Sequence, residues 1–219
     1  MRTNGNGAGT LTAPIMLNIP RIDVRELQIT LVGDSPLISH KWSEKAKKEM
    51  LDKQMKKAKA AKDAKEPRRD YIDSMYWLSE QPDMPTDDQI AAARFGFPCV
   101  AFKAAAVGAC RFADGIRMTE ARGAFHVVGE FAEIAGHPDM REDMVRIGMG
   151  TSDIRYRGEF KRWRTTLTIA YNAAALSPEQ IVSLFNIAGF GIGVGEWRPE
   201  KDGQYGRFHV ATESELEAP

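Results

Sequence analysis

Cysteine is scarce in this sequence, and long apolar runs are missing. Only Cys99 and Cys110 occur among the 219 residues, and neither has companion Cys or His residues at metal-ligand spacing. The sequence therefore indicates neither a disulfide framework nor a zinc finger, and we expect two reduced thiols, no metal and no cofactor. No apolar run approaches the roughly 18 to 20 residues that cross a bilayer, and the first residues lack the apolar core of a signal peptide. We expect a cytoplasmic protein without a membrane partner.

An excess of charge of one sign is also missing, since 30 Lys and Arg residues balance 30 Asp and Glu residues. This balance excludes the simplest signature of a nucleic-acid-binding domain, which is a strongly basic whole. The charge is nevertheless uneven. Twelve basic residues stand against six acidic ones from Lys41 to Asp70, and seven stand against four from Arg141 to Arg164. The first run is either a solvated charged helix or a basic arm for phosphates, and its composition leaves both interpretations open.

The first half of the chain predicts a strand followed by a helical insertion. Residues 1–20 hold too few large apolar side chains to offset the entropy of ordering, so we expect a flexible arm there. Alternating side chains predict a strand from Glu26 to Val32. Good helix formers run from His40 to about Ala64, with Ser43 as the N-cap. Because an irregular connection with two prolines follows, residues 40 to about 97 are interpreted as a basic helical insertion.

The second half predicts the rest of a small α+β fold. Its expected elements are a helix over 101–111, a strand over 122–134, a strand pair or long hairpin over 153–171, a helix from Ser177, a last strand over 207–210 and an acidic tail over 212–219. Ser177 and Gln180 form a capping box, and Gly189 can end that helix in a left-handed conformation. With the insertion set aside, the order strand, helix, strand, strand, helix, strand predicts a ferredoxin-like βαββαβ fold.

A glycine-rich segment, Gly189 to Pro199, follows the Ser177 helix. A dinucleotide-binding fingerprint needs a strand before the glycines and a helix after them, and here that order is reversed. No phosphate-binding loop of the Gly-Lys-Ser or Gly-Lys-Thr type occurs either. Glycines of this kind allow close backbone approach, either to a flat or charged ligand or to the protein's own sheet. Both alternatives stay open, although nearby aromatic and basic residues favour contact with a ligand.

The βαββαβ order with a glycine-rich loop between its second helix and last strand resembles the RAMP superfamily of CRISPR backbone and processing proteins. The stretches Ser35 to Ala46 and Gly189 to Pro199 are also similar to small proteins of phages and prophages. The RAMP resemblance covers residues 24 to 211 and implies an RRM-like or RAMP-like domain over 21–211, whose loop lies near bound RNA. It further implies a thumb-like insertion, subunits that form filaments along a single strand, and partners in a ribonucleoprotein complex. The phage resemblance places the protein in the cytoplasm of a bacterial host cell.

Catalytic motifs are missing. The four histidines His40, His126, His137 and His209 are scattered, and none belongs to a metal-ligand or nucleophile motif. Related RNA-processing proteins use a histidine as acid or base, which makes His40 and His126 the candidates if they meet near a scissile phosphate. Asp34 matches loosely the place where some filament subunits have an RNA-cleaving aspartate, but an Asp-Ser-Pro turn is the simpler explanation of that residue. We therefore assign no catalytic residue.

Our prediction from the sequence is a noncatalytic protein that binds single-stranded RNA or DNA and self-associates along the strand. Basic side chains would meet phosphates, tryptophans would stack on bases, and loop glycines would allow close approach. The predicted nucleic-acid-binding residues are Lys41, Trp42, Lys45, Lys48, Lys53, Lys56, Lys57, Arg155, Arg157, Arg162, Arg164, Gly191, Gly193, Gly195, Trp197, Arg198 and Arg207.

Two alternatives belong to other functional classes. One is a phage-encoded protein–protein interaction module, an inhibitor or assembly component, that docks through the basic helix and the acidic tail. The other is a metal-independent ribonuclease that depends on His40 or His126.

Overall fold

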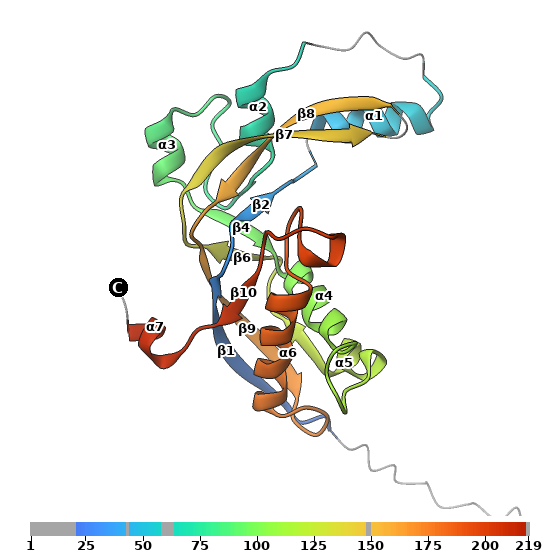
Figure 1. Cartoon of the computed structure of the whole chain (residues 1–219), viewed down its shortest axis with the longest axis vertical. Helices are drawn as coiled ribbons and strands as arrows, with labels where there is room; N and C mark the ends of the chain where they lie inside the picture. Colours follow the sequence, from blue (N-terminus) through green and yellow to red (C-terminus); the bar gives the residue numbers. More distant parts are fainter. Residues whose placement is uncertain (1–20, 43, 58–63, 148–149, 218–219) are drawn as a thin grey trace, which may run out of the picture.

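The computed structural model describes residues 21–42, 44–57, 64–147 and 150–217 of the chain. The predicted arm over 1–20 and the predicted N-cap Ser43 lie outside these residues. The fold is α+β, and its lower half in Figure 1 is built on a four-stranded sheet whose neighbouring strands are all antiparallel. Across this sheet the strands are β10 (Phe208–Val210), β1 (Val24–Gly33), β9 (Arg164–Asn172) and β5 (Phe125–Val127).

Strand β1 lies inside this sheet, between β10 and β9. It pairs with β9 over nearly its whole length, from Val24 opposite Asn172 to Val32 opposite Arg164. Ile29 and Leu31 are buried in the core, as the period-two pattern predicts.

Two helices cover one face of the sheet, and both follow from local sequence. Helix α4 (Cys99–Ala109) consists largely of small buried residues, which let it approach the sheet closely, and its Phe102 meets Phe208 of β10 at a ring distance of 6.2 Å. Helix α6 (Pro178–Gly191) begins with the predicted capping box, in which Ser177 accepts from Gln180 N and Gln180 accepts from Ser177 N. Between them in the chain comes the short helix α5 (Met118–Ala124).

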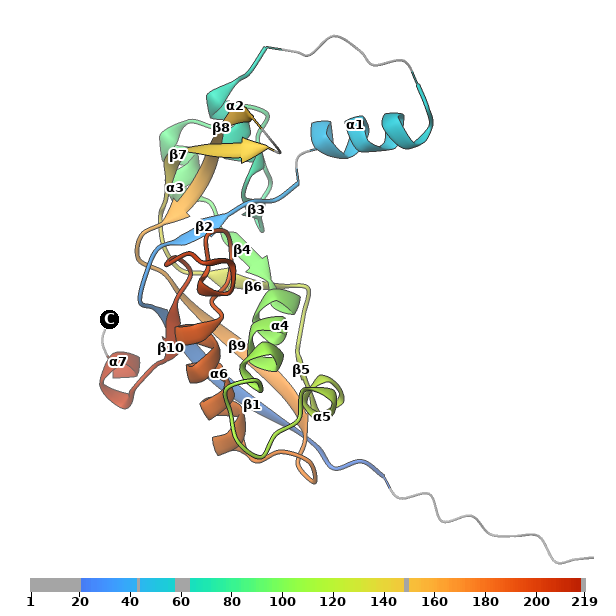
Figure 2. The same cartoon turned by 45° about the vertical axis from the view of Figure 1, so that its right-hand side comes forward.

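The upper half of the molecule holds two three-stranded sheets (Figures 1 and 2). One is formed, in order, by β2 (Leu37–Ser39), β8 (Thr151–Phe160) and β7 (Pro138–Ile147). The other is formed by β3 (Tyr76–Trp77), β4 (Phe95–Pro98) and β6 (Phe131–Ile134). Helices α2 (Pro67–Asp73) and α3 (Asp87–Ala92) lie beside these sheets, and helix α1 (Glu44–Gln54) projects to one side in Figure 2.

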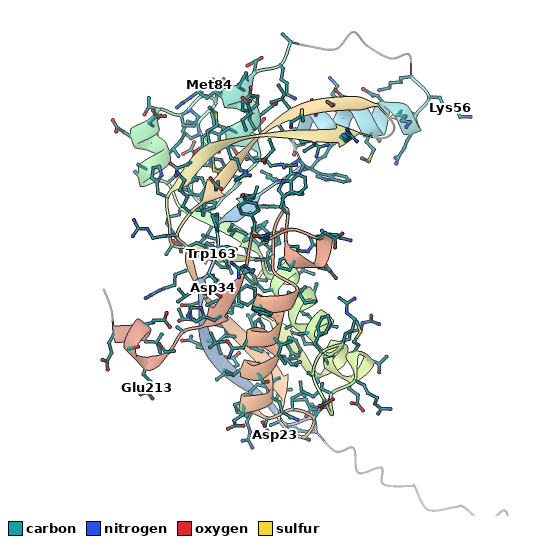
Figure 3. The ribbon with its side chains drawn as sticks, in the orientation of Figure 1. Asp23, Asp34, Lys56, Met84, Trp163 and Glu213 are labelled. Atoms are coloured by element: carbon teal, nitrogen blue, oxygen red, sulfur yellow. The ribbon has the colours of Figure 1, made fainter. Side chains whose placement is uncertain are left out.

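The two halves meet at Trp163, which Figure 3 labels next to Asp34 at the waist of the molecule. The Trp163 indole is 3% exposed and donates to Ser35 O at 2.9 Å. Its ring also contacts Phe208 of the lower sheet at 6.1 Å. Trp163 therefore fixes the chain where it passes from β8 in the upper half to β9 in the lower half.

Several predicted elements differ from the observed ones. The 153–171 stretch forms two strands, as predicted, but β8 and β9 lie in different sheets and form no hairpin, because β8 pairs with β7 and β2. The stretch 122–134 is not one strand, since it contains the end of α5, then β5, then β6 in another sheet. The helix expected from His40 to Ala64 is observed as α1 from Glu44 to Gln54. Gly189 does not end its helix, which continues to Gly191.

No helix among the described residues is both long enough and apolar enough to cross a membrane. The acidic tail contains a short helix, α7 (Glu213–Glu217), and a 3-10 turn, η1 (Pro199–Lys201), lies in the loop after α6.

Candidate nucleic-acid interface

The loop between α6 and β10, residues 193–206, is here called the glycine loop, and it packs tightly against its own protein. Gly195 and Gly206 both have positive φ. A Cβ atom on Gly195 would lie 2.6 Å from Ile38 O, and one on Gly206 would lie 1.7 Å from Val194 O. Internal packing, which was one of the two interpretations of these glycines, therefore accounts for both positions without a ligand.

Backbone hydrogen bonds attach the glycine loop to the segment around β2. Glu196 N donates to Ile38 O at 3.1 Å, and Gly206 N donates to Pro36 O at 2.8 Å. These bonds fix the backbone at Glu196 beside the residues that follow β2. As a result the loop brings Glu196 within reach of His40.

His40, Glu196 and Arg157 form a chain of charged and polar groups that joins three parts of the fold. His40 Nδ1 lies 3.1 Å from Glu196 Oε1, and Arg157 Nη2 of β8 lies 3.7 Å from Glu196 Oε2. The hydrogen bond with His40 lowers the pKa of Glu196, and the Arg157 charge acts in the same direction against partial burial. Glu196 is therefore ionised and orients the His40 ring through Nδ1, which leaves Nε2 to face another group.

Arg157 is the most deeply buried cation of this group, with 1% of its side chain exposed. It also pairs with Asp143 of β7 at 3.2 Å, while its Nε has no hydrogen-bond partner in the described structure. Burial lowers the pKa of Arg157, and the charges of Glu196 and Asp143 oppose that effect. The expectation that Arg157 meets phosphates does not fit this burial, because its guanidinium is closed off by the protein's own carboxylates.

The ion-pair network continues across the β7–β8 hairpin. Arg141 donates to Asp143 and to Glu159, both at 2.8 Å, and its guanidinium lies 4.6 Å from the centre of the Tyr205 ring of the glycine loop. Cations and carboxylates thus alternate on this face of the hairpin. The face is close to neutral, so it lacks the strong positive potential that an unpaired basic patch would create.

Two exposed tryptophans neighbour the His40–Glu196 contact in sequence, one next to each partner. Trp42 follows His40 by two residues and is 56% exposed, and Trp197 follows Glu196 and is 40% exposed. Arg155 of β8 is also near, since its charge acts on Glu196 and helps to lower the pKa of that carboxyl. We call the set Trp42, His40, Arg155, Glu196 and Trp197 the indole cluster.

The structure brings six of the predicted binding residues to one region. These are Trp42, Arg155, Arg157, Gly195, Trp197 and Arg198. Arg198 is partly engaged, because it donates to Gly195 O and pairs with Glu200 at 3.0 Å.

The predicted lysines lie on or near α1, away from that region. Lys48, Lys53, Lys56 and Lys57 are exposed, and the side chain of Lys45 lies outside the described part of the structure. Figure 3 labels Lys56 at the outer end of α1. Helix α1 itself contains four lysines against three acidic residues, so most of the positive excess of the 41–70 region lies outside this helix. Some of its charge is paired, as between Lys57 and Asp52 at 2.8 Å.

The other predicted residues are dispersed. Arg162 is exposed, Arg164 of β9 donates to Glu215 O of α7, and Arg207 donates to Gln204 O. Gly191 is the last residue of α6, where a Cβ atom would lie 3.9 Å from the Phe112 ring, and a Cβ atom on Gly193 would lie 2.7 Å from Pro199. Lys41 is bonded through its backbone N to Ser74 O.

Sequence reasoning did not single out three residues that organise this region. Glu196, Arg141 and Asp143 gave no signal, because a lone carboxylate among glycines and ordinary charges on a strand are common surface features. In the structure Arg141 of β7 lies directly opposite Arg157 of β8, and two like charges so placed need acidic partners beside them, but the sequence alone does not report this register.

The remaining histidines have partners of their own. His126 Nδ1 lies 3.0 Å from Lys103 Nζ, and His209 lies between Asp34 and Glu215. His40 and His126 therefore do not meet. Among the residues that the structure describes, no group of three or more His, Cys, Asp or Glu side chains is placed to hold a metal ion.

No protein-family model matches this chain, and no curated protein matches it in sequence. Among solved structures, Cmr6 from Pyrococcus furiosus is similar, with a TM-score of 0.43 and 12% identity over 87% of this chain and 100% of the other. At this TM-score the likeness assigns neither a family nor a function.

Proposed function

We propose that this protein binds single-stranded nucleic acid without cleaving it, and that the indole cluster is the binding site. The observation that carries the proposal is the exposure of Trp42 and Trp197, which neighbour in sequence the two partners of one contact, His40–Glu196. Exposed indoles give unpaired bases a stacking surface.

Stacking rather than charge would supply most of the affinity at this site. Each stacked base contributes about 1 to 3 kcal/mol. The neighbouring cations already have carboxylate partners, as Arg157 has Asp143 and Glu196. Phosphates would be met by Arg155 and by the exposed lysines at and beyond the end of α1, such as Lys53 and Lys56. Sequence preference is expected to be weak, because every base offers an aromatic face.

The strand order supports a ferredoxin-like core for this binder. Elements β1, α4, β5, β9, α6 and β10 follow one another as strand, helix, strand, strand, helix, strand, and the first strand lies between the last and the third. We assign this core to residues 21–211, with residues 40–97 as an insertion, 1–20 as an N-terminal arm and 212–219 as an acidic tail. The upper sheets add a second excursion between β5 and β9.

Association with further copies along the strand, or with other proteins of a ribonucleoprotein complex, is part of the same proposal. The supporting feature is apolar surface on α1, where Met50 and Leu51 are 42% and 55% exposed, and on Met55, just after the helix, which is 57% exposed. Helix α1 would then contact a neighbouring subunit through this apolar surface.

Fluorescence anisotropy with labelled single-stranded RNA and DNA tests the binding site. Trp42→Ala and Trp197→Ala should each weaken binding by about 5- to 150-fold, which is the loss of one stacked base. Phe190→Ala is the matched control, because this ring is 78% exposed on α6 and lies outside the indole cluster. Equal affinities of all three variants and the native protein would exclude the site. If the native protein binds no oligonucleotide and instead retains a protein partner, the interaction-module alternative holds.

A specific observation favours one further candidate, a metal-independent ribonuclease. A histidine whose Nδ1 is held by an ionised carboxylate presents Nε2 as a general acid or base, and His40 has this arrangement with Glu196. Labelled single-stranded RNA incubated with a metal chelator should then be cleaved by the native protein and not by His40→Ala. His126→Ala is the control, since His126 lies apart from His40 and contacts Lys103. RNA that stays intact with native protein excludes this candidate.

A further inference from the structure

Helix α7 is attached to the rest of the protein mainly through one residue. None of its five residues is buried, and Leu216 is 56% exposed. The Glu215 carboxylate accepts hydrogen bonds from Thr212 N and Oγ1, which precede it in the chain, and lies 3.0 Å from His209 Nε2 of β10. The Glu215 carbonyl accepts a hydrogen bond from Arg164 of β9 at 2.8 Å. Docking of α7 thus depends on His209 and Arg164 rather than on apolar burial.

His209 and Arg164 lie in one row on the face of the four-stranded sheet that α4 and α6 leave uncovered. Val32 of β1 is the register partner of both residues, so the three side chains point the same way across β10, β1 and β9. The neighbouring Phe208 points to the opposite face, where it meets Phe102 of α4. Helix α7 therefore sits on the uncovered face, on the side where Figure 3 labels Glu213.

His209 is held between two carboxylates from different segments. Its Nδ1 lies 2.7 Å from Asp34 Oδ1, in the turn after β1, and its Nε2 lies 3.0 Å and 3.1 Å from the two oxygens of Glu215. An ionised carboxylate only accepts hydrogen bonds, and a neutral imidazole has one N–H to donate. Both contacts are therefore satisfied together only by the imidazolium form.

We propose that His209 is a proton-dependent latch, which holds the acidic helix α7 on the uncovered sheet face when His209 is protonated and releases it when His209 is neutral. The remaining proton of neutral His209 goes to Asp34, because that contact is shorter and the Asp34 turn is fixed beside Trp163. Glu215 belongs to a short helix without buried residues, which gains conformational entropy when it leaves the sheet. The charged groups facing His209 are Asp34 and Glu215, and Arg164 contacts the same helix through a backbone carbonyl that does not titrate.

The ionisation of these groups agrees with this geometry. Partial burial alone would lower the pKa of His209, but the hydrogen bonds with Asp34 and Glu215 outweigh burial and raise it above its ordinary value. Hydrogen bonds from Thr212, with a contribution from His209, lower the pKa of Glu215 to about 2. The latch is thus closed on the acid side of neutrality, where His209 carries its proton, and opens as pH rises through the raised pKa.

Release of α7 would change the charge of the uncovered face. Arg164 would lose its contact with Glu215 O, and the carboxylates of Glu213, Glu215 and Glu217 would move away with the helix. Opening costs the face one positive charge, that of His209, but removes three negative ones, so the uncovered face would become more positive, and more attractive to anions, at mildly alkaline pH than at mildly acidic pH.

Backbone relaxation by NMR on the full chain tests the latch. The order parameters of the Leu216 and Glu217 amides should be about 0.85 near pH 5.5 and fall below about 0.6 near pH 8.5. In His209→Gln and in Glu215→Gln they should be low at both pH values, whereas His126→Gln should behave as the native chain does. Native amides that stay rigid at both pH values, or mobile at both, overturn the proposal. A His209→Gln helix that is as rigid as the native one at low pH overturns it too, provided that the spectrum outside residues 205–217 is unchanged.

Discussion

The indole of Trp163 lies directly over the backbone of Gly33. Trp163 O accepts from Gly33 N at 2.9 Å, and a Cβ atom on Gly33 would lie 2.2 Å from Trp163 Nε1. This contact leaves no room for a side chain at the junction of the two halves. Gly33→Ala should therefore lower the free energy of unfolding by about 2 to 3 kcal/mol, because Trp163 would have to give up its packing.

Denaturant titration of Gly33→Ala and Gly123→Ala measures this effect. The Gly123 position is the control, because a Cβ there meets no atom within 4 Å and the residue lies in α5. Alanine in a helix is favoured over glycine by about 1 kcal/mol, so Gly123→Ala should be neutral or stabilising. If the Gly33 variant is as stable as the native protein, Trp163 is not fixed as described.

Asp143 is the principal partner of the buried Arg157. Asp143→Asn would leave Arg157 with Glu196 alone, at 3.7 Å, and would also remove one contact of Arg141. Breaking a buried ion pair costs about 3 to 5 kcal/mol, and we expect a loss near the lower end because Glu196 remains.

The matched control for this prediction is Asp153→Asn, on the same hairpin. Asp153 pairs with Lys65 and Arg155, but 35% of its side chain is exposed, so its replacement should cost less than about 1 kcal/mol. Thermal and urea unfolding distinguish the two variants. Equal losses would mean that the network around Arg157 is solvated rather than buried.

The sequence predicted those structural features that depend on residues close together in the chain. The capping box at Ser177 is confirmed because its bonds join residues three apart. The end of that helix was predicted wrongly at Gly189, since this glycine serves a contact between distant segments. A Cβ there would lie 1.8 Å from Phe208 O, so Gly189 allows α6 to lie against β10 rather than ending the helix.

Partners that are distant in the chain leave no periodic signal. The alternation from Ile154 to Arg157 within 153–171 correctly indicates a strand, observed as β8, but nothing in it distinguishes β7 from β9 as the partner. The same holds for the candidate site, where His40 and Glu196 are 156 residues apart. Exposure of Trp42 and Trp197 follows from how the glycine loop packs on β2, and composition alone does not report it.

Lys53 and Lys56, at and beyond the end of α1, should contribute the salt-dependent part of nucleic-acid binding. The double variant Lys53→Glu/Lys56→Glu should weaken binding at low salt and reduce the slope of affinity against salt by about one to two units. The charge-matched control is Arg117→Glu/Arg122→Glu, at the start and the end of α5, where both side chains are exposed. Anisotropy titrations at several salt concentrations measure both. If the control variant loses as much affinity as the lysine variant, the loss comes from overall charge and not from the positions of Lys53 and Lys56.

The difference in stability between the native protein and His209→Gln should depend on pH. The pKa of His209 is raised in the folded protein, so its contacts with Asp34 and Glu215 stabilise the fold fully below the unfolded pKa of about 6.5, and this contribution is lost as pH rises through the folded value. Urea midpoints of the two proteins should therefore differ near pH 6 and converge near pH 8.5. His137→Gln serves as the control, because His137 lies 4.0 Å from Asp139 and is 59% exposed. A His209→Gln deficit that stays constant over this range would mean that the native contacts do not require the proton.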